Sequence, residues 1–201
     1  MSAKRLLCIL LTAMLCMLAA CSQGSPKAVA SDLLTRAVAC DAAAVSTLLG
    51  YDVTSLTDIE MYTLSRMEYK IVSTEKLGSH RWNVTVDTRL YDIMSLLNEA
   101  ALYLYTDAEN AETASFDPQY WMLEQLNSNV APRGTFRAVI PLIEENGVIS
   151  VDTSRIEDTL RDAITGGAYS WYKVYEDTFG DAFGTATQPE TETDTETQET
   201  T

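Results

Sequence analysis

The stretch FRAVIPLIEENGVISVD, residues 136–152, indicates the fold class of this chain. Phe, Ala, Ile and Leu alternate with Arg, Val and Pro over residues 136–142, which is the period of a strand with one buried face. The pair Asn146-Gly147 follows, and Asn-Gly is a strong signal for a tight hairpin turn. Residues 148–151 then return as a second strand. The stretch therefore predicts an antiparallel β-hairpin.

A second pair of strands is expected earlier in the chain. Residues 67–75, MEYKIVSTE, alternate between apolar and charged or polar side chains. After a turn at residues 76–80, Trp82, Val84 and Val86 alternate with polar residues. We expect these three side chains to face the core, which makes a second antiparallel pair with one buried face.

Helices account for most of the remaining domain. Apolar residues recur there three and four positions apart, and capping residues stand at the expected ends. The first predicted helix begins at Pro26, and the second begins at Asp41 and ends at Gly50. The other predicted helices span about 56–66, 91–105, 118–126 and 153–164, and Gly166-Gly167 stops the last of them. The predicted class is α+β, with a curved antiparallel sheet packed on helices.

Several of these segments, in this order, resemble a family of exported bacterial proteins with a nuclear-transport-factor-like, or cystatin-like, domain. They are LLTRAVACDAAAVSTLLG (33–50), MEYKI (67–71), WNVTVDTRLYD (82–92) and the hairpin at 136–152. The resemblance covers roughly residues 25–167 and is typical of lipoproteins common in Gram-positive bacteria. It implies a curved sheet wrapped on helices, often with a pocket at the wide end. Many relatives carry a tryptophan after the hairpin glycine, where this chain has Val148 and Ile149.

The first residues have the layout of a secretory signal peptide. Lys4 and Arg5 precede an apolar segment from Leu6 to Ala20. A membrane-spanning helix needs about 20 predominantly apolar residues, and this segment is shorter. We therefore expect residues 1–20 to be a signal peptide and the protein to be exported.

The end of this segment, Leu18-Ala19-Ala20-Cys21, resembles the lipobox of bacterial lipoproteins. The resemblance implies that a diacylglycerol is attached to the Cys21 thiol and that cleavage follows Ala20. A further acyl chain such as palmitate on the new amino group would give the multiple chains that stable anchoring needs. The expected location is the outer face of the bacterial cytoplasmic membrane, with residues 21–24 as lipidated cysteine and short linker.

The rest of the chain divides into one domain and a tail. Residues 25–184 suit a single α+β domain with one core. Residues 185–201 contain mainly Thr, Glu and Gln, so we expect an acidic tail without ordered structure. Cys8 and Cys16 would be removed with the signal peptide, and Cys21 would carry the lipid. Cys40 would then be the one free thiol, which excludes an internal disulfide.

Net charge limits the partners of the protein. The chain carries a formal charge of −15, and removal of Lys4 and Arg5 with the signal would make it −17. Such an acidic protein repels nucleic acid, so no nucleic-acid partner is expected. The expected partners are the membrane, through Cys21, and an unidentified small ligand, wall component or envelope protein.

The sequence contains no motif with the spacing of a known catalytic, metal or cofactor site. We therefore expect no catalytic residue, metal or cofactor. His80 is the one histidine of the chain, and its position in a predicted turn favours an exposed side chain.

The candidates for a pocket are Tyr69, Trp82, Asp87 and Asp92. Asp87 lies on the opposite strand face from Trp82 and Val84, and an exposed, paired carboxylate is the plainer interpretation. Isomerase-like members of the resembled fold use a carboxylate general base in an apolar pocket, and by that resemblance Asp87 could serve as one.

Two functional hypotheses follow, and a third stays open. The first is a non-enzymatic binding or envelope-interaction module anchored to the membrane. The second is a pocket enzyme of the same fold with a carboxylate base such as Asp87. A purely mechanical spacer is the third, and it predicts a filled domain without a cavity, since the fold alone implies no reaction.

Overall fold

The computed structural model describes residues 24–106, 117–128 and 130–179, and within them the fold is α+β. The helices are α2 (Pro26–Val38), α3 (Ala42–Leu49), α4 (Asp58–Leu64), α5 (Ile93–Thr106), α6 (Pro118–Asn127), η2 (Thr153–Arg155), α7 (Asp158–Thr165) and α8 (Ala168–Phe179). The strands are β1 (Glu68–Lys76), β2 (Arg81–Tyr91), β3 (Arg133–Glu145) and β4 (Val148–Val151). The predicted fold class, an antiparallel sheet packed on helices, is confirmed.

The sheet has the order β1-β2-β3-β4, and every neighbouring pair is antiparallel. Its longest ladder joins β2 to β3, from the Arg81–Ile143 pair to the Tyr91–Arg133 pair. The turn between β3 and β4 holds Asn146 at φ 53° and Gly147 at φ 78°. Two positive φ values in succession are what the predicted Asn-Gly hairpin turn requires.

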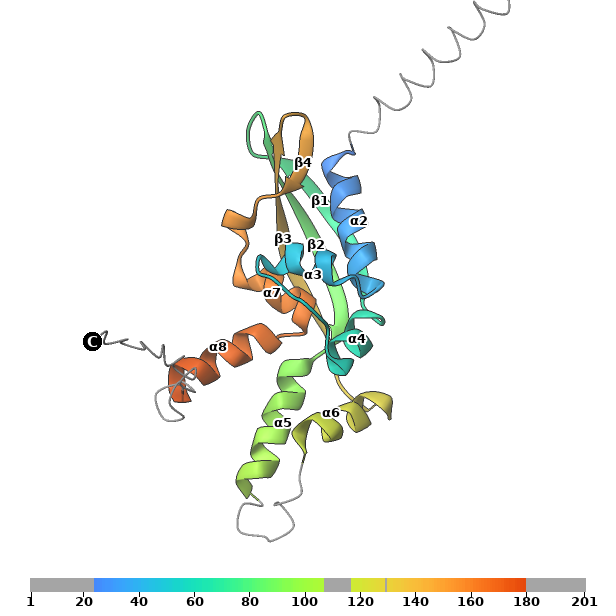
Figure 1. Ribbon diagram of the computed structural model, residues 1–201, viewed down its shortest axis with the longest axis vertical. Coiled ribbons are helices and arrows are strands. Elements are labelled where there is room, and N and C mark those ends of the chain that lie inside the picture. Colours follow the sequence, from blue (N-terminus) through green and yellow to red (C-terminus); the bar gives the residue numbers. More distant parts are fainter. Residues whose placement is uncertain (1–23, 107–116, 129, 180–201) are drawn as a thin grey trace, which may run out of the picture.

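Helices α2, α3 and α7 cover one face of the sheet (Figure 1). Val84 and Val86 are fully buried against them, as predicted, whereas Trp82 is half-buried near the hairpin end. We call this region the sheet core. Its fully buried side chains include Leu34, Leu48, Val84, Val86, Leu90, Ile140, Leu142, Leu160 and Ile164.

Helices α5 and α6 are inserted between β2 and β3 and extend beyond the end of the sheet (Figure 1). With α4 and the start of α8 they form a second, smaller region that we call the helical end. Its buried residues are Tyr91, Ile93, Leu96, Met122, Leu126 and Ala131. The Tyr62 hydroxyl of α4 donates to the Leu126 carbonyl of α6 at 3.0 Å and ties the two helices together.

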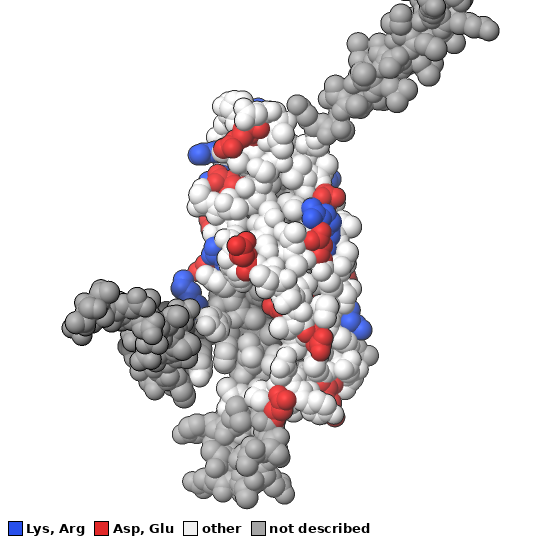
Figure 2. All heavy atoms as spheres, in the orientation of Figure 1, with Lys and Arg blue, Asp and Glu red and all other residues white. Residues whose placement is uncertain are grey.

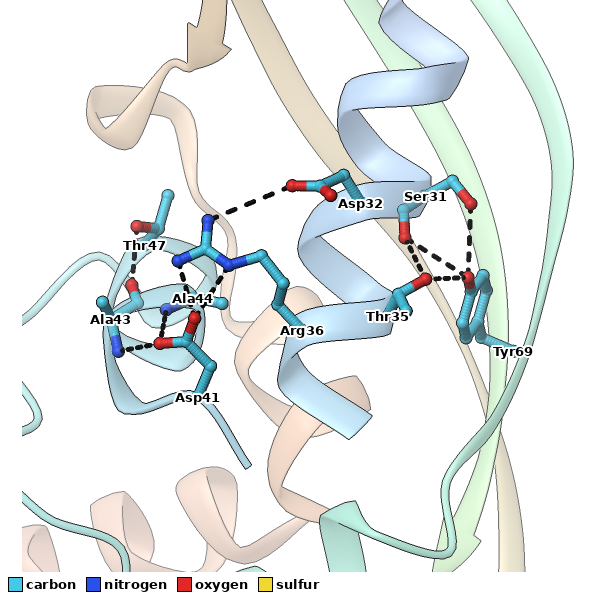
Figure 3. Close-up of polar contacts among 9 residues, drawn as sticks. All are labelled: Ser31, Asp32, Thr35, Arg36, Asp41, Ala43, Ala44, Thr47 and Tyr69. Carbon is cyan, nitrogen blue, oxygen red and sulfur yellow. Dashed lines mark hydrogen bonds and ion pairs between the residues drawn. The ribbon is translucent and has the colours of Figure 1, made fainter. Parts of the chain in front are cut away.

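Side-chain caps fix where the helices begin. Asp41 accepts from the backbone N–H groups of Ala43 and Ala44 at the start of α3, and Arg36 donates to the same carboxylate (Figure 3). These hydrogen bonds satisfy N–H groups that the first helical turn leaves without partners. They also hold the pKa of Asp41 below its ordinary value, the Arg36 hydrogen bond being the largest cause.

The structure differs from the prediction in the last third of the chain. The helix expected over residues 153–164 is divided into η2 and α7, because Ile156 is extended and turns its side chain into the sheet core. Gly166 ends α7 in the left-handed conformation, as expected. No element is predicted after Gly167, and the aromatic segment that follows forms α8.

The predicted signal peptide, the lipobox residues Leu18, Ala19, Ala20 and Cys21, and the tail at 185–201 lie outside the described residues. Among the helices that the structure does describe, none is long and apolar enough to cross a membrane. The prediction of a lipid anchor therefore stays a prediction.

Candidate functional site: an apolar cavity with an unpaired hydroxyl

A cavity of about 380 Å³ lies where the sheet core meets the helical end. This volume is within the range of about 300–1,000 Å³ that is typical of small-ligand sites. Its apolar walls come from α3, α4, α5, α6, α7 and the start of α8, and include Val45, Leu49, Ile59, Leu64, Ile93, Leu97, Met122, Ile164 and Ala168. Most of these wall residues are buried, so the interior of the cavity is mainly apolar.

Three polar side chains that line the cavity, those of Thr57, Glu60 and Thr165, form hydrogen bonds within the fold. The Glu60 carboxylate accepts from the Thr57 backbone N–H at 2.7 Å and from the Thr57 hydroxyl at 2.9 Å, which completes a capping box on α4. The Thr165 hydroxyl donates to the Arg161 carbonyl at 2.9 Å and accepts from the Tyr169 N–H at 3.2 Å. These hydrogen bonds satisfy the polar side chains of Thr57, Glu60 and Thr165 without a ligand.

Thr63 of α4 is the exception. It lines the cavity, its residue is 3% exposed, and its hydroxyl oxygen has no hydrogen-bond partner within the described structure. Leaving a buried polar group unsatisfied costs about 1–3 kcal/mol. A native fold tolerates this cost where an unseen partner, such as a ligand, completes the hydrogen bond.

Other threonines in helices of this protein form a hydrogen bond that Thr63 lacks. Thr35 donates to the Ser31 carbonyl and Thr47 to the Ala43 carbonyl, each at 2.8 Å and each four residues back (Figure 3). This local bond is the ordinary way to satisfy a threonine inside a helix. The hydroxyl of Thr63 lacks that bond, although Ile59 lies four residues earlier in the same helix.

Glu60 supplies the negative charge of the site. It is the one ionisable side chain among the described residues that line the cavity. Its charge also affects Tyr51, whose pKa is raised first by burial and then by the Glu60 carboxylate. The site is therefore apolar inside and acidic at its rim.

Asp87 lies on the opposite face of the sheet from the helices and does not line this cavity. Arg137 donates to both of its carboxylate oxygens, at 2.7 and 2.9 Å. The Arg137 hydrogen bond holds the pKa of Asp87 below its ordinary value. A general base at neutral pH needs the opposite shift, so this position gives the enzyme hypothesis no support.

Asp92 lies next to the cavity but caps a helix. Its carboxylate accepts from the Ser95 N–H at 3.0 Å and from the Ser95 hydroxyl at 2.8 Å, at the start of α5. The following residue, Ile93, is a cavity wall. Asp92 therefore positions the wall without facing a ligand.

Tyr69 joins the sheet to α2, and Trp82 contacts the neighbouring strand of the sheet. The Tyr69 hydroxyl forms hydrogen bonds with Ser31 and Thr35 of α2 (Figure 3). The Trp82 ring faces the Lys76 ammonium, 5.8 Å from the ring centroid. The structure thus brings none of the four sequence-chosen candidates into the cavity.

The cavity residues were missed from sequence because helix phase was misjudged in α4. The apolar side chains of Ile59, Met61 and Leu64 predict the inward face of this helix from sequence, but Met61 is 40% exposed. Thr63 is buried instead. A threonine in a short amphipathic helix gives no sequence signal for an unpaired hydroxyl, because such a residue normally bonds to its own helix.

Charges on the surface are mixed. Figure 2 shows acidic and basic side chains scattered over the face in view, separated by uncharged areas. His80 is exposed in the β1–β2 turn and lies 3.5 Å from the Glu144 carboxylate. No group of three or more potential metal-binding side chains occurs in the part of the chain that the structure describes.

No family model, curated protein or solved structure matches this chain. Function is therefore inferred from the residues and their geometry alone. Within the described structure, the buried side-chain atoms without a hydrogen-bond partner are the Thr63 hydroxyl at the cavity and, at η2, Asp152 Oδ2 and Arg155 Nη1.

Proposed function

We propose that this protein is a membrane-anchored extracytoplasmic lipoprotein whose domain binds a small, largely apolar molecule without chemical turnover. The observation that carries this proposal is the apolar cavity, in whose wall the buried hydroxyl of Thr63 has no hydrogen-bond partner. A filled domain, which the mechanical-spacer hypothesis requires, is not what the helical end presents. A ligand would offset the cost of the open cavity and of the unpaired hydroxyl together.

The cavity favours binding over catalysis. Its one ionisable lining residue among those described, Glu60, is held in a helix cap with Thr57, and the Thr63 and Thr165 hydroxyls have no base among their hydrogen-bond partners. Nucleophilic or acid–base catalysis needs a reactive group within hydrogen-bond reach of a second polar group. Asp87, the base of the enzyme hypothesis, is paired with Arg137 on the other face of the sheet.

Anchoring at Cys21 is supported by its resemblance to a lipobox and by the expected signal before it. Helix α2 begins at Pro26, so a lipid on Cys21 would hold this end of the domain close to the bilayer. In Figure 1 the start of α2 and the helical end lie at opposite ends of the domain. The cavity would then receive its ligand from outside the cell rather than from the membrane.

Kinship with the nuclear-transport-factor-like, or cystatin-like, domains is part of the same proposal. Its support is the order of elements: opening helices, an antiparallel sheet of consecutive strands, and a pocket beside the sheet. Members of that group include binding modules, so kinship is compatible with the role proposed here.

Binding can be tested on residues 22–201, which contain the whole described structure. Titration with the neutral fluorescent probe N-phenyl-1-naphthylamine is expected to give saturable binding. Ala168→Trp should abolish binding because Ala168 lines the cavity and indole would fill it. Ala43→Trp, at an exposed position of α3, is the matched control and should bind normally. Absence of saturable binding, or equal binding by both variants, would contradict the proposal.

The anchor is tested separately on the full chain in a bacterial host. Cys21→Ala should abolish incorporation of labelled palmitate, block cleavage after Ala20 and leave the protein out of the lipid-modified fraction. The matched control is Cys40→Ala, because Cys40 lies in the turn between α2 and α3. A Cys21→Ala protein that still carries fatty acid would show that the lipobox resemblance misleads.

A further inference from the structure

We infer that the cavity selects an uncharged or cationic amphiphile that hydrogen-bonds to Thr63, and that it rejects anionic ligands such as fatty-acid carboxylates. This inference rests on the proposed binding function and names the chemical class of the ligand. It is drawn from one unpaired hydroxyl, the apolar walls around it and the charge at the rim.

The hydroxyl defines the polar group of the ligand. A threonine hydroxyl both donates and accepts, so a ligand hydroxyl, carbonyl, ether or amide would complete it. Thr63 is 3% exposed and its hydroxyl oxygen is itself buried, so the inferred hydrogen bond requires the side chain to turn this oxygen toward the cavity when a ligand binds.

Charge excludes an anion. Among the described lining residues there is no Lys, Arg or His, and Glu60 contributes a negative charge. A carboxylate brought into this space would lose water without gaining a counter-ion. The nearby Arg161 offers little to a ligand, because its Nε donates to the Leu49 carbonyl at 3.0 Å and its Nη1 to Asp158 at 2.7 Å.

The hydrogen-bonding group, the apolar body and the charged end of the ligand are expected to lie at different depths in the cavity. The hydrogen-bonding group meets Thr63 inside, and the apolar body fills the space between Leu64, Ile93 and Met122. Glu60 is exposed at the rim, where a cationic group of the ligand could remain partly in water. A positive charge is therefore tolerated at the outer end, while a negative charge is opposed everywhere.

The experiment is displacement of N-phenyl-1-naphthylamine from residues 22–201 by 1-decanol, decylamine and decanoate at neutral pH. These three compounds share one chain length and differ in the polar group. The alcohol and the amine are expected to displace the probe, and decanoate to bind at least about tenfold more weakly, which corresponds to one unfavourable polar contact.

Three variants assign this selectivity to residues. Thr63→Val removes the hydroxyl at nearly constant volume and should lower the affinity for 1-decanol by about tenfold. Thr63→Ser keeps the hydroxyl and should retain binding. Glu60→Gln keeps a side chain able to cap α4. This variant should bind decylamine more weakly and decanoate more tightly than wild type does. Thr47→Val is the control, because that hydroxyl bonds to its own helix outside the cavity.

The outcomes separate the two proposals. If no variant and no wild-type protein binds the probe, the binding function itself is wrong. If the probe binds but decanoate displaces it as well as 1-decanol does, the ligand class is wrong while the binding function stands. Unchanged 1-decanol affinity in folded Thr63→Val protein, checked by circular dichroism, would also overturn the inferred class.

Discussion

Two buried threonines show how the sheet core differs from the helical end. Thr88 of β2 is fully buried in the sheet core, and its hydroxyl donates to the Ala163 carbonyl at 2.7 Å. Thr63 of α4 is nearly as buried, and its hydroxyl has no partner among the described residues. Of these two hydroxyls, the chain completes the hydrogen bond of Thr88 and leaves that of Thr63 open.

This difference separates structural roles from binding roles. A hydroxyl that joins β2 to α7, as Thr88 does, stabilises the fold and needs nothing from outside. An unpaired hydroxyl in an apolar cavity costs stability unless something binds there. Asp87, paired with Arg137 on the outer sheet face, belongs with Thr88 in the first group.

The largest effect should come from removing packed volume. Leu48→Ala deletes a fully buried side chain of the sheet core and should lower the free energy of unfolding by about 2–5 kcal/mol. Leu97→Ala alters a half-buried wall of the cavity and should cost clearly less, because that side chain already faces open space. Urea unfolding of both variants compares the two regions directly. Equal losses would mean that the helical end is packed as tightly as the sheet core.

A smaller effect is expected when the paired hydroxyl is removed. Thr88→Val leaves the Ala163 carbonyl without its donor in a buried position. The expected loss is about 1–3 kcal/mol of unfolding free energy, measured by thermal or urea unfolding. Ligand affinity should not change, since Thr88 does not line the cavity. A stability equal to wild type would remove the contrast between the two threonines.

The smallest effect concerns acid stability. The folded-state pKa of Asp87 is lowered, so its pairing stabilises the fold above the unfolded pKa, near 3.8, and this contribution is lost as pH falls through the folded value. Asp87→Asn should melt slightly below wild type at neutral pH and converge with it in strong acid. The measurement is melting temperature against pH for the two proteins. A difference that stays constant down to the lowest pH would contradict this assignment.

The fold was largely readable from local signals. Alternation predicted the strands, and the Asn146-Gly147 pair predicted their turn. Ser25 and Asp41 cap the helices that the sequence placed after them, and Thr57 caps α4 within the span predicted for that helix. These signals act over a few residues, so they are visible without the tertiary structure.

The site was not readable in the same way. A cavity depends on how α3 to α8 pack together, and no short segment encodes the space they leave. Thr63 carries no motif, and Met61 offered a more apolar candidate for the same helix. The aromatic residues of α8 gave no clear period either. Such features are set by long-range packing, which overrides local pattern.

The most direct test of the account is one variant measured in two ways. Thr63→Val should match or exceed wild type in unfolding free energy without ligand, because it removes an unsatisfied buried hydroxyl. The same variant should lose affinity for 1-decanol. Higher stability with weaker binding is the expected result, since it means that the hydroxyl is kept for a ligand. Lower stability with unchanged binding would contradict the account, because Thr63 would then be a structural residue.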